Sequence, residues 1–185
     1  LGAGFLAHQG VEPRRQLALA LATIDPQGRD PALRRIVLVG HSMGGKVGMQ
    51  LALQYPGLVD RLAAEFGRFY DTTGFDVNEK RVAELEKGHD ATLETTDEEL
   101  TAAEKLSYTT NPDDLEGCNF YVVTVPTPIG DSNRPLLTPL KKASETLGKV
   151  VGKGDIMVYE STVYPGATEE FCVPIIERLS GLKMN

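Results

Sequence analysis

Short apolar runs of strand length alternate along the chain with longer stretches that have helical periodicity. Because strands that alternate with helices build parallel sheets, the pattern predicts an α/β fold: a Rossmann-like parallel sheet with helices on both faces. The strands are predicted at residues 36–40, 72–77, 119–125 and 155–160. Helices are predicted at residues 14–24, 43–54, 58–69, 78–87 and 138–151, after Thr96, and after Thr168.

Polar residues mark where several of these helices begin and end. Asn78 is placed to cap the helix that runs to residue 87, with Gly88 just beyond its end. Thr96 and Glu99 have the spacing of a capping box, in which each side chain binds the other residue's backbone N–H. Thr168 is expected to cap the closing helix, with Glu169 and Glu170 in its first turn.

Composition narrows the class of protein. The 185 residues are 41% apolar and carry a net charge of −7, which disfavours nucleic acid or an anionic membrane as the main partner. No apolar run is long enough to span a bilayer and no signal peptide is visible, so we expect a cytoplasmic protein. Cys118 and Cys172 lack the spacing of a metal site, and we expect two reduced thiols and no metal.

Charge is unevenly distributed along the chain. Residues 1–62 carry seven basic and four acidic side chains and use mostly arginine, whereas residues 63–185 carry twelve basic and twenty-two acidic ones and use mostly lysine. This change predicts a mosaic of two segments, 1–61 and 62–185, which pack as one α/β unit.

The first segment contains the sequence IVLVGHSMGG at residues 36–45. A strand, a Gly-x-Ser-x-Gly turn and a helix resemble the nucleophile elbow of the α/β-hydrolases, and the resemblance implies a serine esterase that uses Ser42. Asp76 and His89 follow Ser42 in the family's order of acid and base. They flank one short predicted helix, however, so we expect no working triad.

The second segment contains six characteristic runs: LAAEFG at 62–67, GFDVN at 74–78, GHDATLE at 88–94, YVVTVPTP at 121–128, LTPLKKASET at 137–146 and YESTVYPGAT at 159–168. In this order they resemble the N-terminal, NAD-binding half of the nucleotide-sugar 6-dehydrogenases, particularly those acting on UDP-N-acetylhexosamines. The family oxidises the C6 alcohol of a nucleotide sugar to the acid. The resemblance implies NAD as cofactor and a dinucleotide or nucleotide-sugar partner.

The resemblance also implies site residues. Asp76 ends a predicted strand, where a carboxylate accepts from the adenosine ribose hydroxyls and repels the 2′-phosphate of NADP. Thr127 matches a threonine that helps hold cofactor and catalytic water, and Thr162 matches a cofactor contact. Glu169 matches a glutamate that assists hydrolysis of the covalent intermediate.

The chain departs from the family at its glycine fingerprint. No Gly-x-Gly-x-x-Gly precedes residue 62, and two partial substitutes exist. One is the turn from Gly40 to Gly45, with Ser42 at the second glycine position; the other is GAGFLA at 2–7, which no predicted strand precedes. Gly45 lies 31 residues before Asp76, where about 20 are expected. The family's catalytic cysteine is also unmatched, so we expect an NAD-binding fragment that is incomplete for catalysis. A serine esterase and an inactive chimeric scaffold remain as alternatives, and self-association stays open.

Overall fold

A computed structural model describes residues 35–40, 63–64, 66–91, 95–130, 134–161 and 163–184. These residues all lie within one compact unit, Leu33–Met184. The description below concerns this part of the chain.

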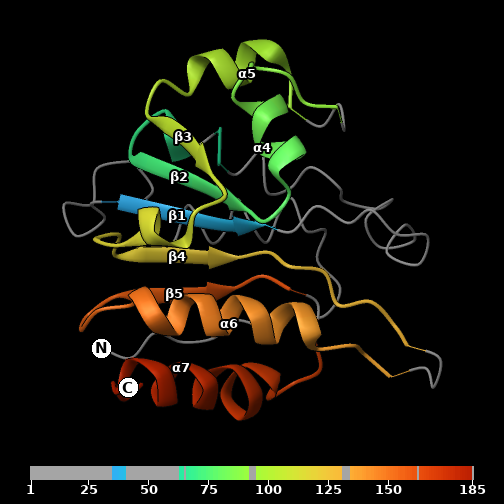
Figure 1. The fold of residues 1–185 in the computed structure, drawn as a ribbon, viewed down its shortest axis with the longest axis vertical. Coiled ribbons are helices and arrows are strands. Elements are labelled where there is room, and N and C mark those ends of the chain that lie inside the picture. The colour runs from blue at the N-terminus through green and yellow to red at the C-terminus, as the bar shows by residue number, and fades with distance from the viewer. Residues whose placement is uncertain are drawn as a thin grey trace. The chain divides into compact units, whose positions relative to one another are not determined.

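Five parallel strands form one sheet in the order β3-β2-β1-β4-β5, as Figure 1 shows. They are β1 (Arg35–Gly40), β2 (Asp71–Asp76), β3 (Leu106–Thr109), β4 (Phe120–Val123) and β5 (Ile156–Tyr159). The four strands that the sequence predicts are confirmed, and β3 was not predicted. β1 occupies the centre, where Gly40 lies opposite Asp76 and Val39 lies opposite Val123.

Helices follow β2, β4 and β5 along the described chain. The described helices are α4 (Glu79–Leu85), α5 (Asp97–Ala102), α6 (Thr138–Val150) and α7 (Val173–Ser180), together with a 3-10 turn η1 (Pro112–Leu115) and a π-helical turn η2 (Thr168–Cys172). Asn78 caps α4 and the Thr96–Glu99 capping box opens α5, as predicted.

Two predicted helix ends need correction. α4 ends at Leu85 rather than at residue 87, and the chain then turns through Gly88, whose φ of 71° is left-handed and suits glycine. Thr168 does not cap the closing helix, because the cap position falls on Ala167 and makes no side-chain hydrogen bond. Thr168 lies inside the first turn and is buried, as are Ala167 before it and Cys172 at the end of η2.

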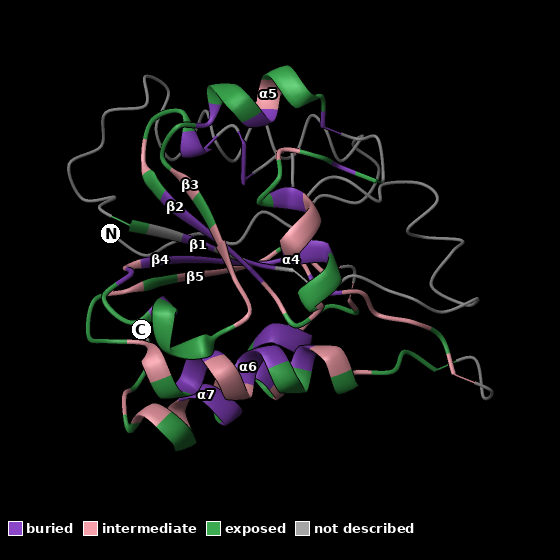
Figure 2. Cartoon of the chain, turned by 45° about the horizontal axis from the view of Figure 1, so that its top comes forward, coloured by how far each residue is buried: buried purple, intermediate pink, exposed green. Residues whose placement is uncertain are grey.

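Side chains on the two faces of the sheet pack against different helices. On one face Val37, Val39, Tyr121 and Val123 cluster with the apolar stripe of α6 at Leu140, Ala143 and Leu147. On the other face the Phe120 ring lies 6.5 Å from the ring of Phe66, in a helical turn before β2. Figure 2 shows the resulting distribution, with buried residues concentrated on β2 and β4 and on the inner sides of α6 and α7. The expectation of helices on both faces is therefore met.

Candidate functional site

The carboxyl ends of the parallel strands meet at one edge of the sheet, towards which the arrowheads of Figure 1 point. We call the residues at and directly after these ends the carboxyl edge. Its members from the described residues include Gly40 of β1, Asp76 of β2, Thr124 after β4 and Glu160 after β5. In open α/β sheets, ligands bind at this edge, where the strand order reverses.

Asp76 is the last residue of β2 and is half-buried. Its Oδ1 accepts a hydrogen bond of 2.8 Å from the backbone N–H of Asn78. That bond fixes the carboxylate relative to the turn that leads into α4. Because Gly40 pairs with Asp76 in the register, the end of the neighbouring strand brings no side chain beside the carboxylate.

Asn78 begins α4 at the same edge. Its Oδ1 accepts from the backbone N–H groups of Lys80 at 3.1 Å and Arg81 at 3.3 Å. These donors belong to the first turn, whose N–H groups have no partners within a helix. Asn78 therefore links the Asp76 turn and the start of α4 through its backbone and its side chain.

The loop that carries Thr127 is tied to both neighbouring strands. The backbone N–H and the Oγ1 of Thr124 donate to the carbonyl oxygen of Val39, at 3.1 and 3.2 Å. The Ser161 hydroxyl donates to the carbonyl oxygen of Val125 at 2.6 Å, so the loops after β4 and β5 are joined. Thr127 lies two residues after Val125 and is half-buried. Thr127 therefore lies on the loop that leaves the carboxyl edge after β4, and its role in holding the cofactor stays a prediction.

Glu160 is the first residue after β5, and its backbone N–H donates to the carbonyl oxygen of Val123 at 2.9 Å. Loss of hydration raises the pKa of the Glu160 carboxyl, although part of the side chain stays exposed. The sequence did not single out Glu160, Thr124 or Ser161 as site residues by chemistry, because their roles here depend on which strands are neighbours.

The described structure does not test the other predicted site residues. Glu169 is exposed in η2 and stays a prediction. Ser42, Gly45 and Thr162 lie outside the described residues. Asp76 and His89 lie beyond opposite ends of α4, whose seven residues span about 10 Å, and the described residues give the triad no support.

Both cysteines are free and buried, Cys118 beside β4 and Cys172 in η2. Burial raises the pKa of both thiols. For Cys118 this outweighs the positive charge of nearby Arg35, which lowers the pKa by stabilising the thiolate. Such thiols stay protonated near neutral pH and are poor nucleophiles. Among the described residues no helix is long and apolar enough to cross a membrane, and no cluster of three metal-ligating side chains occurs.

Comparison with known proteins gives the family. The NAD-binding-domain pattern of the UDP-glucose/GDP-mannose dehydrogenase family matches residues 53–185. The chain belongs to this family. Its cofactor is accordingly NAD, as predicted. The family match begins nine residues before the predicted boundary at residue 62.

Several dehydrogenases are similar to this segment. A UDP-N-acetyl-D-glucosamine 6-dehydrogenase of Pseudomonas aeruginosa is 56% identical over 135 residues, which are 73% of this chain and 32% of the relative. The Protein CapL of Staphylococcus aureus is 49% identical over 132 residues, 71% of this chain and 30% of that protein. A UDP-D-ManNAc dehydrogenase structure from Pyrococcus horikoshii superposes with a TM-score of 0.65 at 28% identity, over 82% of this chain and 34% of that one.

The family member described here thus spans about a third of the length of these relatives. A GDP-mannose dehydrogenase structure from Pseudomonas aeruginosa, 19% identical with a TM-score of 0.66 over 79% of this chain and 33% of that one, agrees in fold. The NAD-binding Rossmann-like domain is therefore established.

Proposed function

We propose that this domain binds the adenosine ribose of NAD through Asp76 and serves a dehydrogenase that oxidises the C6 alcohol of a UDP-N-acetylhexosamine to the acid. The observation that carries the proposal is the Asp76 carboxylate, which ends the second strand of the sheet and is oriented by the Asn78 N–H. A carboxylate at this position accepts from ribose hydroxyls. The substrate class is supported by the 56% identity to a UDP-N-acetyl-D-glucosamine 6-dehydrogenase.

The residues around Asp76 suit a dinucleotide. Gly40 has no side chain and lies opposite Asp76, and the pyrophosphate would bind beside it, with Gly45 contributing. Thr127 lies on a loop tied to β1 and β5 and would hold the cofactor together with Thr162. Glu169 would assist the water that hydrolyses the covalent intermediate. NAD itself would supply hydride acceptance.

The decisive test is a titration of the 185-residue chain with NAD and with NADP, in which binding is monitored by NMR through the backbone amide resonances. We expect NAD affinity between micromolar and millimolar, because the Gly-x-Gly-x-x-Gly phosphate contacts are missing. Asp76→Ala should weaken NAD binding by about 10–100-fold, the loss of charge-assisted hydrogen bonds. Glu98→Gln, which removes an exposed carboxylate of α5, is the matched control and should change nothing. Submicromolar affinity, or unchanged affinity in Asp76→Ala, would show that the site is misplaced.

A second experiment concerns turnover. A polypeptide of these 185 residues should form no NADH with UDP-glucose or with UDP-N-acetylated glucosamine, galactosamine or mannosamine. Covalent catalysis needs an activated thiolate, whereas Cys118 and Cys172 are buried with raised pKa values. Sustained NADH production that Cys172→Ser abolishes would contradict this expectation.

The mosaic origin is a further part of the proposal, supported by the change in charge and in arginine and lysine usage near residue 62. The two segments, 1–61 and 62–185, would share one sheet because β1 pairs with β2 and β4. The esterase alternative at Ser42 gains no support from the described residues, and a fluorophosphonate should not label Ser42 above background. A cytoplasmic location and self-association stay predictions.

A further inference from the structure

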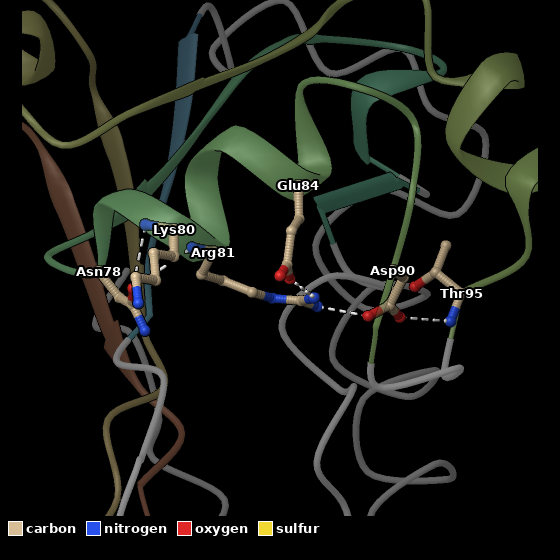
Figure 3. Close-up of polar contacts among 6 residues, drawn as sticks. All are labelled: Asn78, Lys80, Arg81, Glu84, Asp90 and Thr95. Atoms are coloured by element: carbon tan, nitrogen blue, oxygen red, sulfur yellow. Dashed lines mark hydrogen bonds and ion pairs between the residues drawn. The ribbon is translucent and has the colours of Figure 1, made fainter.

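A continuous series of polar contacts leads from Asp76 away from the carboxyl edge to the start of α5. Asp76 accepts from the N–H of Asn78, and the Asn78 side chain accepts from the N–H of Arg81. The Arg81 guanidinium donates to Asp90 Oδ1 at 2.5 Å. Asp90 Oδ2 accepts from the N–H of Thr95 at 2.9 Å. Figure 3 shows the Arg81 side chain extended along the helix towards Asp90, on the opposite side from Asn78.

The Arg81–Asp90 ion pair is almost fully buried, with Arg81 7% exposed and Asp90 2% exposed. Burying an ion pair removes hydration from both charges, and well-packed apolar residues often stabilise a protein as much. A buried pair is therefore weak as a source of stability. Its directional contacts give it another use, which is to hold two elements in one geometry.

The element held here is α4, which has only seven residues. Helices this short are marginal on their own and depend on tertiary contacts. Val82 and Leu85 supply the buried apolar contacts of α4, and such contacts are not directional. The bond from Arg81 to Asp90 therefore fixes how the helix is rotated, and Asn78 moves with the first turn that it caps.

We infer that Asp90 is a positioning residue for cofactor binding: through Arg81 and Asn78 it fixes the orientation of the Asp76 carboxylate. The inference rests on the proposed role of Asp76 in binding the ribose. Asp90 makes no contact with ligand in this scheme. Its effect on NAD affinity therefore passes entirely through Asp76.

A double-mutant cycle on the 185-residue chain tests this dependence. Asp90→Asn keeps an acceptor for Thr95 and removes the buried charge that faces Arg81, while the more exposed Glu84 carboxylate stays 3.7 Å from Arg81 Nη1. We expect Asp90→Asn to weaken NAD binding about tenfold in the wild-type background and less than twofold in the Asp76→Ala background. Glu145→Gln, which breaks an exposed ion pair on α6, should leave the NAD dissociation constant unchanged in both backgrounds.

A second pair of variants answers the same question if Asp90→Asn does not fold, as judged by far-ultraviolet circular dichroism. Asn78→Ala removes the helix cap, whereas Asn78→Ser retains a capping hydroxyl. We expect Asn78→Ala to weaken NAD binding at least fivefold only when Asp76 is present. Asn78→Ser should restore most of that affinity.

The outcomes separate the two proposals. If Asp76→Ala weakens NAD binding but the Asp90 or Asn78 substitution weakens it equally in both backgrounds, the network supports the fold alone and the positioning role is wrong. The role of Asp90 is also wrong if folded Asp90→Asn leaves the affinity unchanged, whatever the Asn78 variants do. If the wild-type chain does not bind NAD, or binds it equally well as Asp76→Ala, the assignment of Asp76 fails and the positioning role fails with it.

Discussion

The helices beside β2 and β3 differ from those beside β4 and β5 in length and in the contacts that hold them. α4 and α5 have seven and six residues, and their first turns are bound by the side chains of Asn78 and by the Thr96–Glu99 capping box. α6 has thirteen residues, begins without a side-chain cap, and buries an apolar stripe against the main core. We refer to β1–β3 with α4 and α5 as the first half, and to β4, β5, α6 and α7 as the second half.

The difference matches the tasks of the two halves. Apolar burial is non-directional and contributes most of the stability of a fold, whereas hydrogen bonds contribute less and fix geometry. The first half contains Asp76, whose use depends on the direction of its carboxylate, and polar contacts surround it. The second half contributes α6, which covers the larger core. That core joins residues of β1 and β2 to Tyr121, Leu140 and Leu147, and the loop of Thr127 is anchored beside it. Most of the stability is thus expected from the core that α6 covers, whereas the contacts that orient Asp76 lie at the start of α4.

The largest expected effect is a cavity in the second half. Leu147→Ala removes a side chain that is 0% exposed in the main core and should lower the free energy of unfolding by about 3–4 kcal/mol. Leu100→Ala, in the small cluster of Ala64, Ala103 and Leu106, should cost about 2 kcal/mol because α5 can collapse onto the gap. Urea unfolding measures both values. Equal losses would remove the contrast between the halves.

Alkaline pH should act on the second half. Burial raises the pKa values of Tyr121 and Tyr159 above the ordinary value of 10.0, so the folded state keeps both hydroxyls neutral. Their contribution to stability is present below pH 10 and is lost as pH rises towards the folded-state values. Each of the two groups should lower the free energy of unfolding by about 1.4 kcal/mol for every pH unit above 10.

The check is urea unfolding of wild type and Tyr159→Phe between pH 8 and pH 11. At pH 8 the variant should be about 1 kcal/mol less stable, because the Ser144–Tyr159 hydrogen bond of 2.7 Å is lost. The free energies of unfolding of wild type and Tyr159→Phe, plotted against pH, should converge or cross as pH rises. Tyr164→Phe, at an exposed position, is the control; parallel curves for Tyr159→Phe and wild type would count against the burial effect.

Removal of a cap tests the first half. Thr96→Ala abolishes the hydrogen bond from the Glu99 N–H to the Thr96 hydroxyl, 3.1 Å long, and should cost about 1 kcal/mol. Thr96→Ser keeps the hydroxyl and should lower the free energy of unfolding by only a few tenths of the loss caused by Thr96→Ala. Urea midpoints for the three proteins provide the comparison. A loss of 3 kcal/mol for Thr96→Ala would mean that the cap supports more of the fold than α5 alone.

The local signals in the sequence predicted the elements well because they act over a few residues. The Asn78 cap and the Thr96–Glu99 box each place a side-chain oxygen beside an N–H two or three residues away, and both are confirmed. β3 was missed because its four residues, LSYT, form an edge strand with no buried face. The pairing of β3 with β2 explains the glycine at position 74: Gly74 lies opposite Tyr108, and a Cβ at Gly74 would meet the Tyr108 ring at 2.7 Å.

The candidate site was predictable only in part, for the same reason. Asp76 stands at the end of a strand and could be assigned from its position along the chain. Asp90 could not, because its partner Arg81 lies nine residues away and no local pattern predicts a buried pair at that distance. Likewise, the bond between Ser161 and Val125 joins loops 36 residues apart and follows from the strand order alone.

The smallest expected effect concerns the exposed ion pair of α6, and it sharpens the contrast with Arg81–Asp90. Lys141 Nζ lies 3.8 Å from Glu145 Oε1, one helical turn apart, and the two side chains are 55% and 38% exposed. Such pairs gain little, because water screens the charges and two long side chains lose freedom. Glu145→Gln should therefore change the free energy of unfolding by at most about 0.5 kcal/mol, and by less in 0.5 M salt. If urea unfolding instead gives a loss near that of Thr96→Ala, polar contacts would matter as much in the second half as in the first, and the division between the halves would fail.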